Sequence, residues 1–132
     1  MNRTTMRELI SSFQGPRPKF LYTPCVKSGP LGLVSGMVAL DPDTGRLVEG
    51  GVAAQTQRIF DNLYLALPDY GYGLQDLVLA RIYTTCMDQF ASINAVWEQQ
   101  FTQVAPPART SVGVSALPLA ALVEIEFMFH RI

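Results

Sequence analysis

The chain has 132 residues, of which 48% are hydrophobic and 16% are charged, and its net charge is −1 at pH 7. This length fits a single domain over residues 1–132, and no apolar run reaches the ~18 residues that would span a bilayer. The ten basic residues are scattered and the sequence pI is about 5.7, so we expect no nucleic-acid partner.

The sparse cysteine and histidine content argues against a metal centre. Cys25 and Cys86 are far apart and His130 is the only histidine, so we expect reduced thiols, no metal and a cytoplasmic protein. Residues 1–8 carry charge and are not followed by a signal-like apolar segment. The low charge fraction of so small a domain indicates that partner subunits cover part of its surface, which predicts a homo-oligomer.

The first third of the chain divides at the break Gly15–Pro18. Residues 1–18 form an N-terminal extension, in which Met6, Leu9, Ile10 and Phe13 have the spacing of a short helix of one or two turns. Residues 19–40 have a strand-like pattern. The segment 41–45, Asp-Pro-Asp-Thr-Gly, predicts a turn because proline presets φ and glycine accepts positive φ.

Two amphipathic helices are predicted in the middle of the chain. The first covers residues 52–67 and is expected to end at Pro68 and Gly71. A β-prone run over 77–84 follows. The second helix is expected to begin at Asp88 as N-cap and to run to Phe101, before the diproline 106–107.

The last third predicts two strands. Thr110, Val112 and Val114 alternate with Arg109, Ser111 and Gly113, and in the final strand Val123, Ile125, Phe127 and Phe129 alternate with Glu124, Glu126, Met128 and His130. The order of elements predicts an α/β (α+β) fold, with one sheet and two helices packed on one of its faces. The other face is then available for a subunit contact.

Arg109 and the glutamates of the final strand are the candidates for chemistry. An arginine at the start of a strand can bind a carboxylate through its planar guanidinium. Glu124 and Glu126 share a face of the strand, so one could pair with an arginine while the other acts on water. Spacing alone favours a structural ion pair at an interface over a catalytic role.

Several segments resemble the RidA (YjgF-type) family, also known as endoribonuclease L-PSP-like proteins. The resemblance extends in one consistent order from Tyr22 to the C-terminus. It rests on Val34-Ser35-Gly36, Leu40-Asp41-Pro42-Asp43-Thr44-Gly45, Gln55-Thr56, Asn62-Leu63, Phe90-Ala91-Ser92-Ile93-Asn94, Pro107-Ala108-Arg109-Thr110-Ser111-Val112, Leu117-Pro118 and Leu122-Val123-Glu124-Ile125-Glu126.

The resemblance implies a chorismate-mutase-like fold, with a single mixed sheet, assembled as a homotrimer with clefts between subunits. It also implies that Arg109 binds a substrate carboxylate and that Glu124 positions or activates water. The remaining residues expected near the substrate are Tyr22, Ser35, Gly36, Asn94 and Ser111.

The implied activity is hydrolysis of reactive 2-imino acids of the 2-aminoacrylate type to 2-oxo acids and ammonia, without a cofactor. Arg109 would fix the carboxylate and Glu124 would take a proton from the attacking water. The alternative is a non-catalytic protein that binds a small 2-oxo or imino acid and regulates a partner enzyme, for which Arg109 alone would suffice. Ribonuclease activity, also attached to this family, is disfavoured by the acidic pI.

The chain departs from the family pattern near the expected site. Met37 follows Ser35-Gly36 where glutamine is common, Ser111 occupies a position that can be cysteine, and Phe20-Leu21 replace the usual Gly-Pro. These departures bear on the polarity of the cleft and on the size of its substrate.

Overall fold

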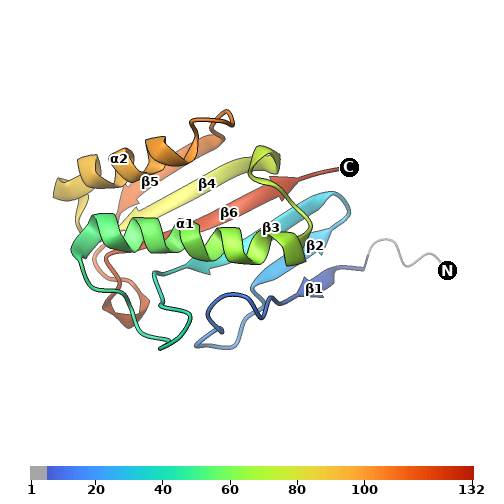
Figure 1. The fold of residues 1–132 in the computed structure, drawn as a ribbon, viewed down its shortest axis with the longest axis horizontal. Coiled ribbons are helices and arrows are strands. Elements are labelled where there is room, and N and C mark those ends of the chain that lie inside the picture. The colour runs from blue at the N-terminus through green and yellow to red at the C-terminus, as the bar shows by residue number, and fades with distance from the viewer. Residues whose placement is uncertain (1–5) are drawn as a thin grey trace.

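The computed structural model describes residues 6–132 and contains one six-stranded sheet with two helices. Figure 1 shows both helices on the same face of the sheet, which confirms the predicted α+β arrangement. Residues 1–5 of the predicted N-terminal extension lie outside the described residues. The strands are β1 (Glu8–Ile10), β2 (Cys25–Ser28), β3 (Leu31–Met37), β4 (Leu77–Thr84), β5 (Ala108–Gly113) and β6 (Val123–His130), and the helices are α1 (Gly51–Tyr70) and α2 (Phe90–Gln100).

The strands lie in the order β1-β2-β3-β6-β4-β5, so the last strand of the chain is inserted at the centre of the sheet. Strands β4 and β5 are parallel and every other pair is antiparallel, which makes the sheet mixed. Three short 3₁₀ segments precede β4, α2 and β6, over Leu74–Asp76, Met87–Gln89 and Pro118–Ala120.

The core lies between the helices and one face of the sheet. The predicted alternation of the final strand is confirmed, because Val123, Ile125, Phe127 and Phe129 are all buried on the helix side. Phe60 of α1 is at the centre of an aromatic cluster, with ring centroids 5.9 Å from Trp97 and 5.7 Å from Phe127. These contacts fasten both helices to the sheet.

Helix α1 is longer than predicted. Pro68 was expected to end it, but the helix continues through Pro68 to Tyr70, and Gly71 ends it in the left-handed conformation with φ 83°. The Gly71 N–H donates to the Leu67 carbonyl at 2.9 Å. The extra turn buries the Tyr70 side chain, which offsets the hydrogen bond that proline cannot make.

The predicted helical turns near Met6–Phe13 are wrong, since residues 8–10 form strand β1. Glu8, Leu9 and Ile10 pair antiparallel with β2. A helix of one or two turns is unstable by itself, whereas the free edge of β2 offers backbone partners at once.

The predicted N-cap of the second helix is also wrong. Asp88 lies inside the 3₁₀ segment, α2 begins at Phe90, and no side chain makes a capping hydrogen bond there. The tight turn after β4 takes up the residues that the sequence pattern would assign to the helix start.

Candidate functional site

Arg109 lies on β5, opposite Ala80 of β4, and its side chain points to the helix side of the sheet. Its Nη1 donates a hydrogen bond of 2.9 Å to Asn94 Oδ1 on α2. The guanidinium carbon is 5.0 Å from the centroid of the Trp97 ring and 5.4 Å from that of Phe90. Two aromatic rings and one amide therefore orient an exposed cation at the edge of the sheet.

Ser111 is two residues beyond Arg109 and shares its face of β5. Its Oγ is buried and has no hydrogen-bond partner within residues 6–132. No carboxylate of the described chain forms an ion pair with Arg109. We call Arg109, Asn94 and Ser111 the arginine cluster, and its free donors suit a carboxylate-bearing molecule.

Glu124 lies on β6 opposite Tyr83 of β4, on the face of the sheet that the helices leave open. Its carboxylate packs against Gly36 so closely that a Cβ at Gly36 would overlap it. Partial burial, and secondly the negative charge of Glu126, raise the pKa of the Glu124 carboxyl. A carboxyl with a raised pKa holds a proton more readily than an ordinary glutamate, which suits a group that exchanges protons with a substrate.

Tyr22 and Ser35 accompany Glu124. Burial, and then the charge of Glu124, raise the pKa of the Tyr22 hydroxyl, which places the two groups in one electrostatic environment. Ser35 Oγ donates a hydrogen bond of 2.6 Å to the Thr23 carbonyl and so fixes the segment that carries Tyr22. We call Glu124, Gly36, Tyr22 and Ser35 the glutamate cluster.

The two clusters lie apart within one chain. Arg109 is in register with Ala80, whose neighbour on β6 is Phe127, and all three point to the helix side. Glu124 is an odd number of residues from Phe127 and therefore points to the opposite side. The predicted pair Arg109 and Glu124 is thus divided between two faces of the sheet.

The second glutamate of β6 has its own partners. Glu126 accepts a hydrogen bond of 2.6 Å from the Tyr83 hydroxyl and lies 3.5 Å from Arg81 Nη1. The arginine that pairs with a glutamate of this strand is therefore Arg81, which the sequence pattern did not single out.

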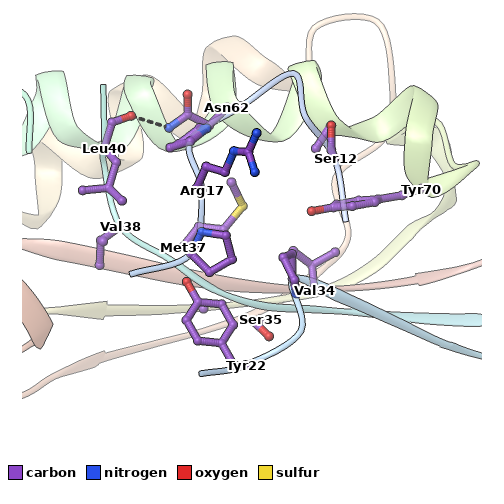
Figure 2. Close-up of a pocket in the computed structure, with 16 residues that line it drawn as sticks. Ser12, Arg17, Tyr22, Val34, Ser35, Met37, Val38, Leu40, Asn62 and Tyr70 are labelled. Atoms are coloured by element: carbon purple, nitrogen blue, oxygen red, sulfur yellow. Dashed lines mark hydrogen bonds between the residues drawn. The ribbon is translucent and has the colours of Figure 1, made fainter. Parts of the chain in front are cut away.

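Sequence reasoning missed two features of this region. Trp97 lies on the apolar stripe of α2, where its spacing indicates a core residue, and its ring also contacts Arg109. The second feature is a cavity between the N-terminal segment, β3 and α1 (Figure 2). Tyr22, Ser35 and Gly36 line this cavity, but the arginine cluster does not.

Two further properties concern the described part of the chain. Within residues 6–132, no group of three or more His, Cys, Asp or Glu side chains is placed to hold a metal ion. None of the helices in the same range is long and apolar enough to cross a membrane.

Comparison with known proteins gives a consistent result. The family model described as Endoribonuclease L-PSP matches residues 14–130. A RutC family protein of Pyrococcus horikoshii is 33% identical over 126 residues, which is 96% of this chain and 99% of the relative.

Solved structures agree with the sequence comparison. RidA from an Antarctic Psychrobacter species has 31% identity and a TM-score of 0.88, covering 94% of this chain and 99% of that one. YyfA of Yersinia pestis, a protein of the conserved Rid family, has 29% identity and a TM-score of 0.90, covering 96% and 100%. The chain therefore belongs to the RidA (YjgF-type) family, the family of the endoribonuclease L-PSP model.

Proposed function

We propose that the protein hydrolyses short 2-imino acids to 2-oxo acids and ammonia in clefts between subunits of a homotrimer. Each cleft combines the arginine cluster of one subunit with the glutamate cluster of its neighbour. The observation that carries this proposal is the division of complementary groups between two faces of one sheet. A carboxylate-binding cation and a proton-accepting carboxyl can then meet only across an interface.

The position of the arginine cluster favours such an assembly. Strand β5 is at the edge of the sheet, whereas Glu124 lies on its open face near the centre. An edge of one subunit packed against the open face of the next is a heterologous contact, which closes into a ring under rotational symmetry. The open face also exposes the apolar side chains of Leu33 and Val112.

In the proposed reaction, Arg109 holds the substrate carboxylate through its planar guanidinium, so that the adjacent C=N carbon lies near Glu124 of the neighbouring subunit. Glu124 takes a proton from water as the oxygen attacks that carbon. Glu124 returns that proton to the nitrogen. The hydroxyl formed on the carbon gives up its own proton to the nitrogen as the C–N bond breaks, so ammonia leaves and the carbon–oxygen bond becomes the carbonyl of the 2-oxo acid. Asn94 and Trp97 keep Arg109 in place, and the Tyr22 hydroxyl lines the cleft.

The first experiment measures ammonia release from a freshly generated short 2-imino acid. Glu124→Ala is expected to lower turnover about 10²- to 10⁴-fold, because it removes the proton acceptor. Arg109→Ala is expected to weaken kcat/KM at least about tenfold, because it removes a charge-assisted contact to the carboxylate. Arg131→Ala, at the C-terminal end, serves as a control and should retain parental turnover.

A mixing experiment tests whether the two clusters come from different subunits. If Arg109→Ala and Glu124→Ala chains are co-refolded in equal amounts, about a quarter of the clefts regain both intact groups, and activity should return to that fraction of the parent's. Mixed assemblies that stay as inactive as either variant alone would rule out the intersubunit site.

The alternative function is binding without turnover. A parent protein that releases no ammonia but binds 2-oxobutyrate, with the affinity lost in Arg109→Ala, would establish a small-acid binding protein that regulates a partner enzyme.

The family description also names an endoribonuclease. The net charge of −1 and the absence of a basic cluster favour the acid over RNA, and we expect no cleavage of RNA by the parent. The cytoplasm stays the predicted location.

A further inference from the structure

The cavity in Figure 2 adjoins the glutamate cluster, because Tyr22, Ser35 and Gly36 line it, but neither Arg109 nor Glu124 does. It has about 600 Å³ of empty space, including its opening to solvent. The floor of the cavity is apolar. It is formed by Val34 and Met37 of β3, by Val38 and Leu40 after that strand, and by Ala66 of α1. The segment from Ser12 to Pro18 covers its other side.

Two polar groups at this cavity lack hydrogen-bond partners among the described residues. The Tyr70 side chain is 95% buried, its hydroxyl makes no hydrogen bond with the described residues, and Figure 2 shows that hydroxyl pointing into the cavity. Asn62 is 1% exposed. Its Nδ2 donates to the Leu40 carbonyl at 2.7 Å, and its Oδ1 has no partner. Buried polar groups are seldom left unpaired without a ligand or water to satisfy them.

Arg17 provides a positive charge at the opening. Its guanidinium lies 4.8 Å from the centroid of the Phe13 ring, and no carboxylate within residues 6–132 forms an ion pair with it. Figure 2 shows the Arg17 side chain among the lining residues, between those of α1 and those of β3. A cation, a hydroxyl donor and an amide acceptor thus surround an apolar pocket.

The hydroxyl group of Tyr70 is a donor at every physiological pH. Burial is the largest cause that raises the pKa of Tyr70 to about 12, so the group keeps its proton. The Tyr70 hydroxyl and the Arg17 guanidinium can both donate hydrogen bonds to the oxygens of one carboxylate. Asn62 Oδ1 is an acceptor, so it can take a hydrogen bond from an N–H or O–H group of a ligand.

We propose that this cavity is a second ligand site, which binds a small aliphatic 2-hydroxy or 2-amino acid. The carboxylate lies between Arg17 and the Tyr70 hydroxyl, the 2-substituent donates to Asn62 Oδ1, and the hydrocarbon part packs on Val34, Met37 and Leu40. The polar groups of this site, on Arg17, Asn62 and Tyr70, belong to neither the arginine cluster nor the glutamate cluster, so their role can be tested separately from the proposed hydrolase activity.

The test is calorimetric titration of the whole protein with 2-hydroxy-3-methylbutanoate, together with ¹³C-methyl NMR of the cavity valines, leucine and Ala66. Binding in the parent should weaken about ten- to a hundredfold in Arg17→Ala and about tenfold in Tyr70→Phe. Ala66→Leu, which fills the cavity, should abolish it. Arg46→Ala, an exposed arginine away from the cavity, is the matched control and should bind like the parent.

Arg109→Ala separates this proposal from the proposed function. Binding that persists in Arg109→Ala and is lost in Arg17→Ala establishes the second site, whatever the outcome of the turnover assay. Binding that is lost in Arg109→Ala and kept in Arg17→Ala overturns it and assigns the ligand to the proposed cleft. If millimolar ligand produces neither heat of binding nor shifts of the methyl signals, the second site is also overturned. If 3-methylbutanoate, which lacks the hydroxyl, binds with equal affinity, the proposed preference for a 2-hydroxy or 2-amino acid is overturned.

Discussion

Gly36 and Glu124 are in direct contact across β3 and β6, and this contact fixes where the Glu124 carboxylate lies. A methyl group at Gly36 would overlap the end of the Glu124 side chain, and the backbone of Gly36 has no positive φ that would resist an alanine. Because the end of a glutamate can move, the fold should accept the change at small cost.

We therefore expect Gly36→Ala to lower turnover at least about tenfold, since a displaced base is no longer in register with its substrate. The midpoint of thermal unfolding should move by only a few degrees. Gly29→Ala is the control. Gly29 lies at a turn with φ 57° and has no atom near its Cβ position, so this change strains the backbone but does not affect the site. A Gly36→Ala protein with parental turnover would contradict the assigned role of Glu124.

Glu126 affects the proton affinity of Glu124 from two residues away. Burial is the larger cause of the raised pKa of Glu124, and the charge of Glu126 adds to it. A base must be deprotonated to act, so activity is lost as pH falls through the raised pKa, that is, at a higher pH than for an ordinary glutamate.

Glu126→Gln removes the like charge and keeps an oxygen that can accept from the Tyr83 hydroxyl. The pKa of Glu124 should fall, and the acidic limb of the pH–rate profile should move to lower pH. Glu98→Gln on α2 provides the matched neutralisation on the helix side and should leave the limb in place. An unchanged limb in Glu126→Gln would mean that Glu124 is not the titrating group.

At the scale of the elements, the loop after β3 is held to α1 by Asn62, whose side chain donates to the Leu40 carbonyl. Asn62→Ala leaves that buried carbonyl unpaired and should lower the free energy of unfolding by about 1–3 kcal/mol. Asp88→Ala should change it by less than about 0.5 kcal/mol, because Asp88 is exposed and makes no capping hydrogen bond. Urea unfolding of both variants measures the difference, and a larger loss in Asp88→Ala than in Asn62→Ala would contradict the role assigned to the Asn62 hydrogen bond.

At the scale of the whole molecule, the open face of the sheet exposes Leu33 and Val112 beside the polar network of Glu126. We expect this face to be covered in the assembly. Leu33→Lys would then place a charge in the interface and should dissociate the proposed trimer into smaller species, as measured by sedimentation velocity. Leu65→Lys replaces an equally exposed leucine on α1 and should leave the mass unchanged. A Leu33→Lys protein that keeps its full mass would show that the contact lies elsewhere.

The sequence by itself determined the elements whose periodicity is strong and local. Strand β6 alternates because one of its faces is buried, and α1 and α2 have apolar stripes that match the core, so their existence and the single-sheet architecture could be predicted. The family resemblance also singled out Arg109 and Glu124. Predictions failed where a neighbour in space decides the conformation: β1 forms because β2 offers an edge, and α1 continues past Pro68 because Tyr70 gains a buried position.

Only the tertiary structure decided how the candidate residues group. Arg109 and Glu124 are fifteen residues apart, but the face of each side chain depends on the register of β5 and β6 against β4, which no local pattern records. The same holds for Arg17 of the N-terminal segment and for Asn62 and Tyr70 of α1, which line one cavity only because the N-terminal segment packs against α1. Side-chain periodicity is a property of one element, whereas a site depends on distances between elements, and those are set by packing.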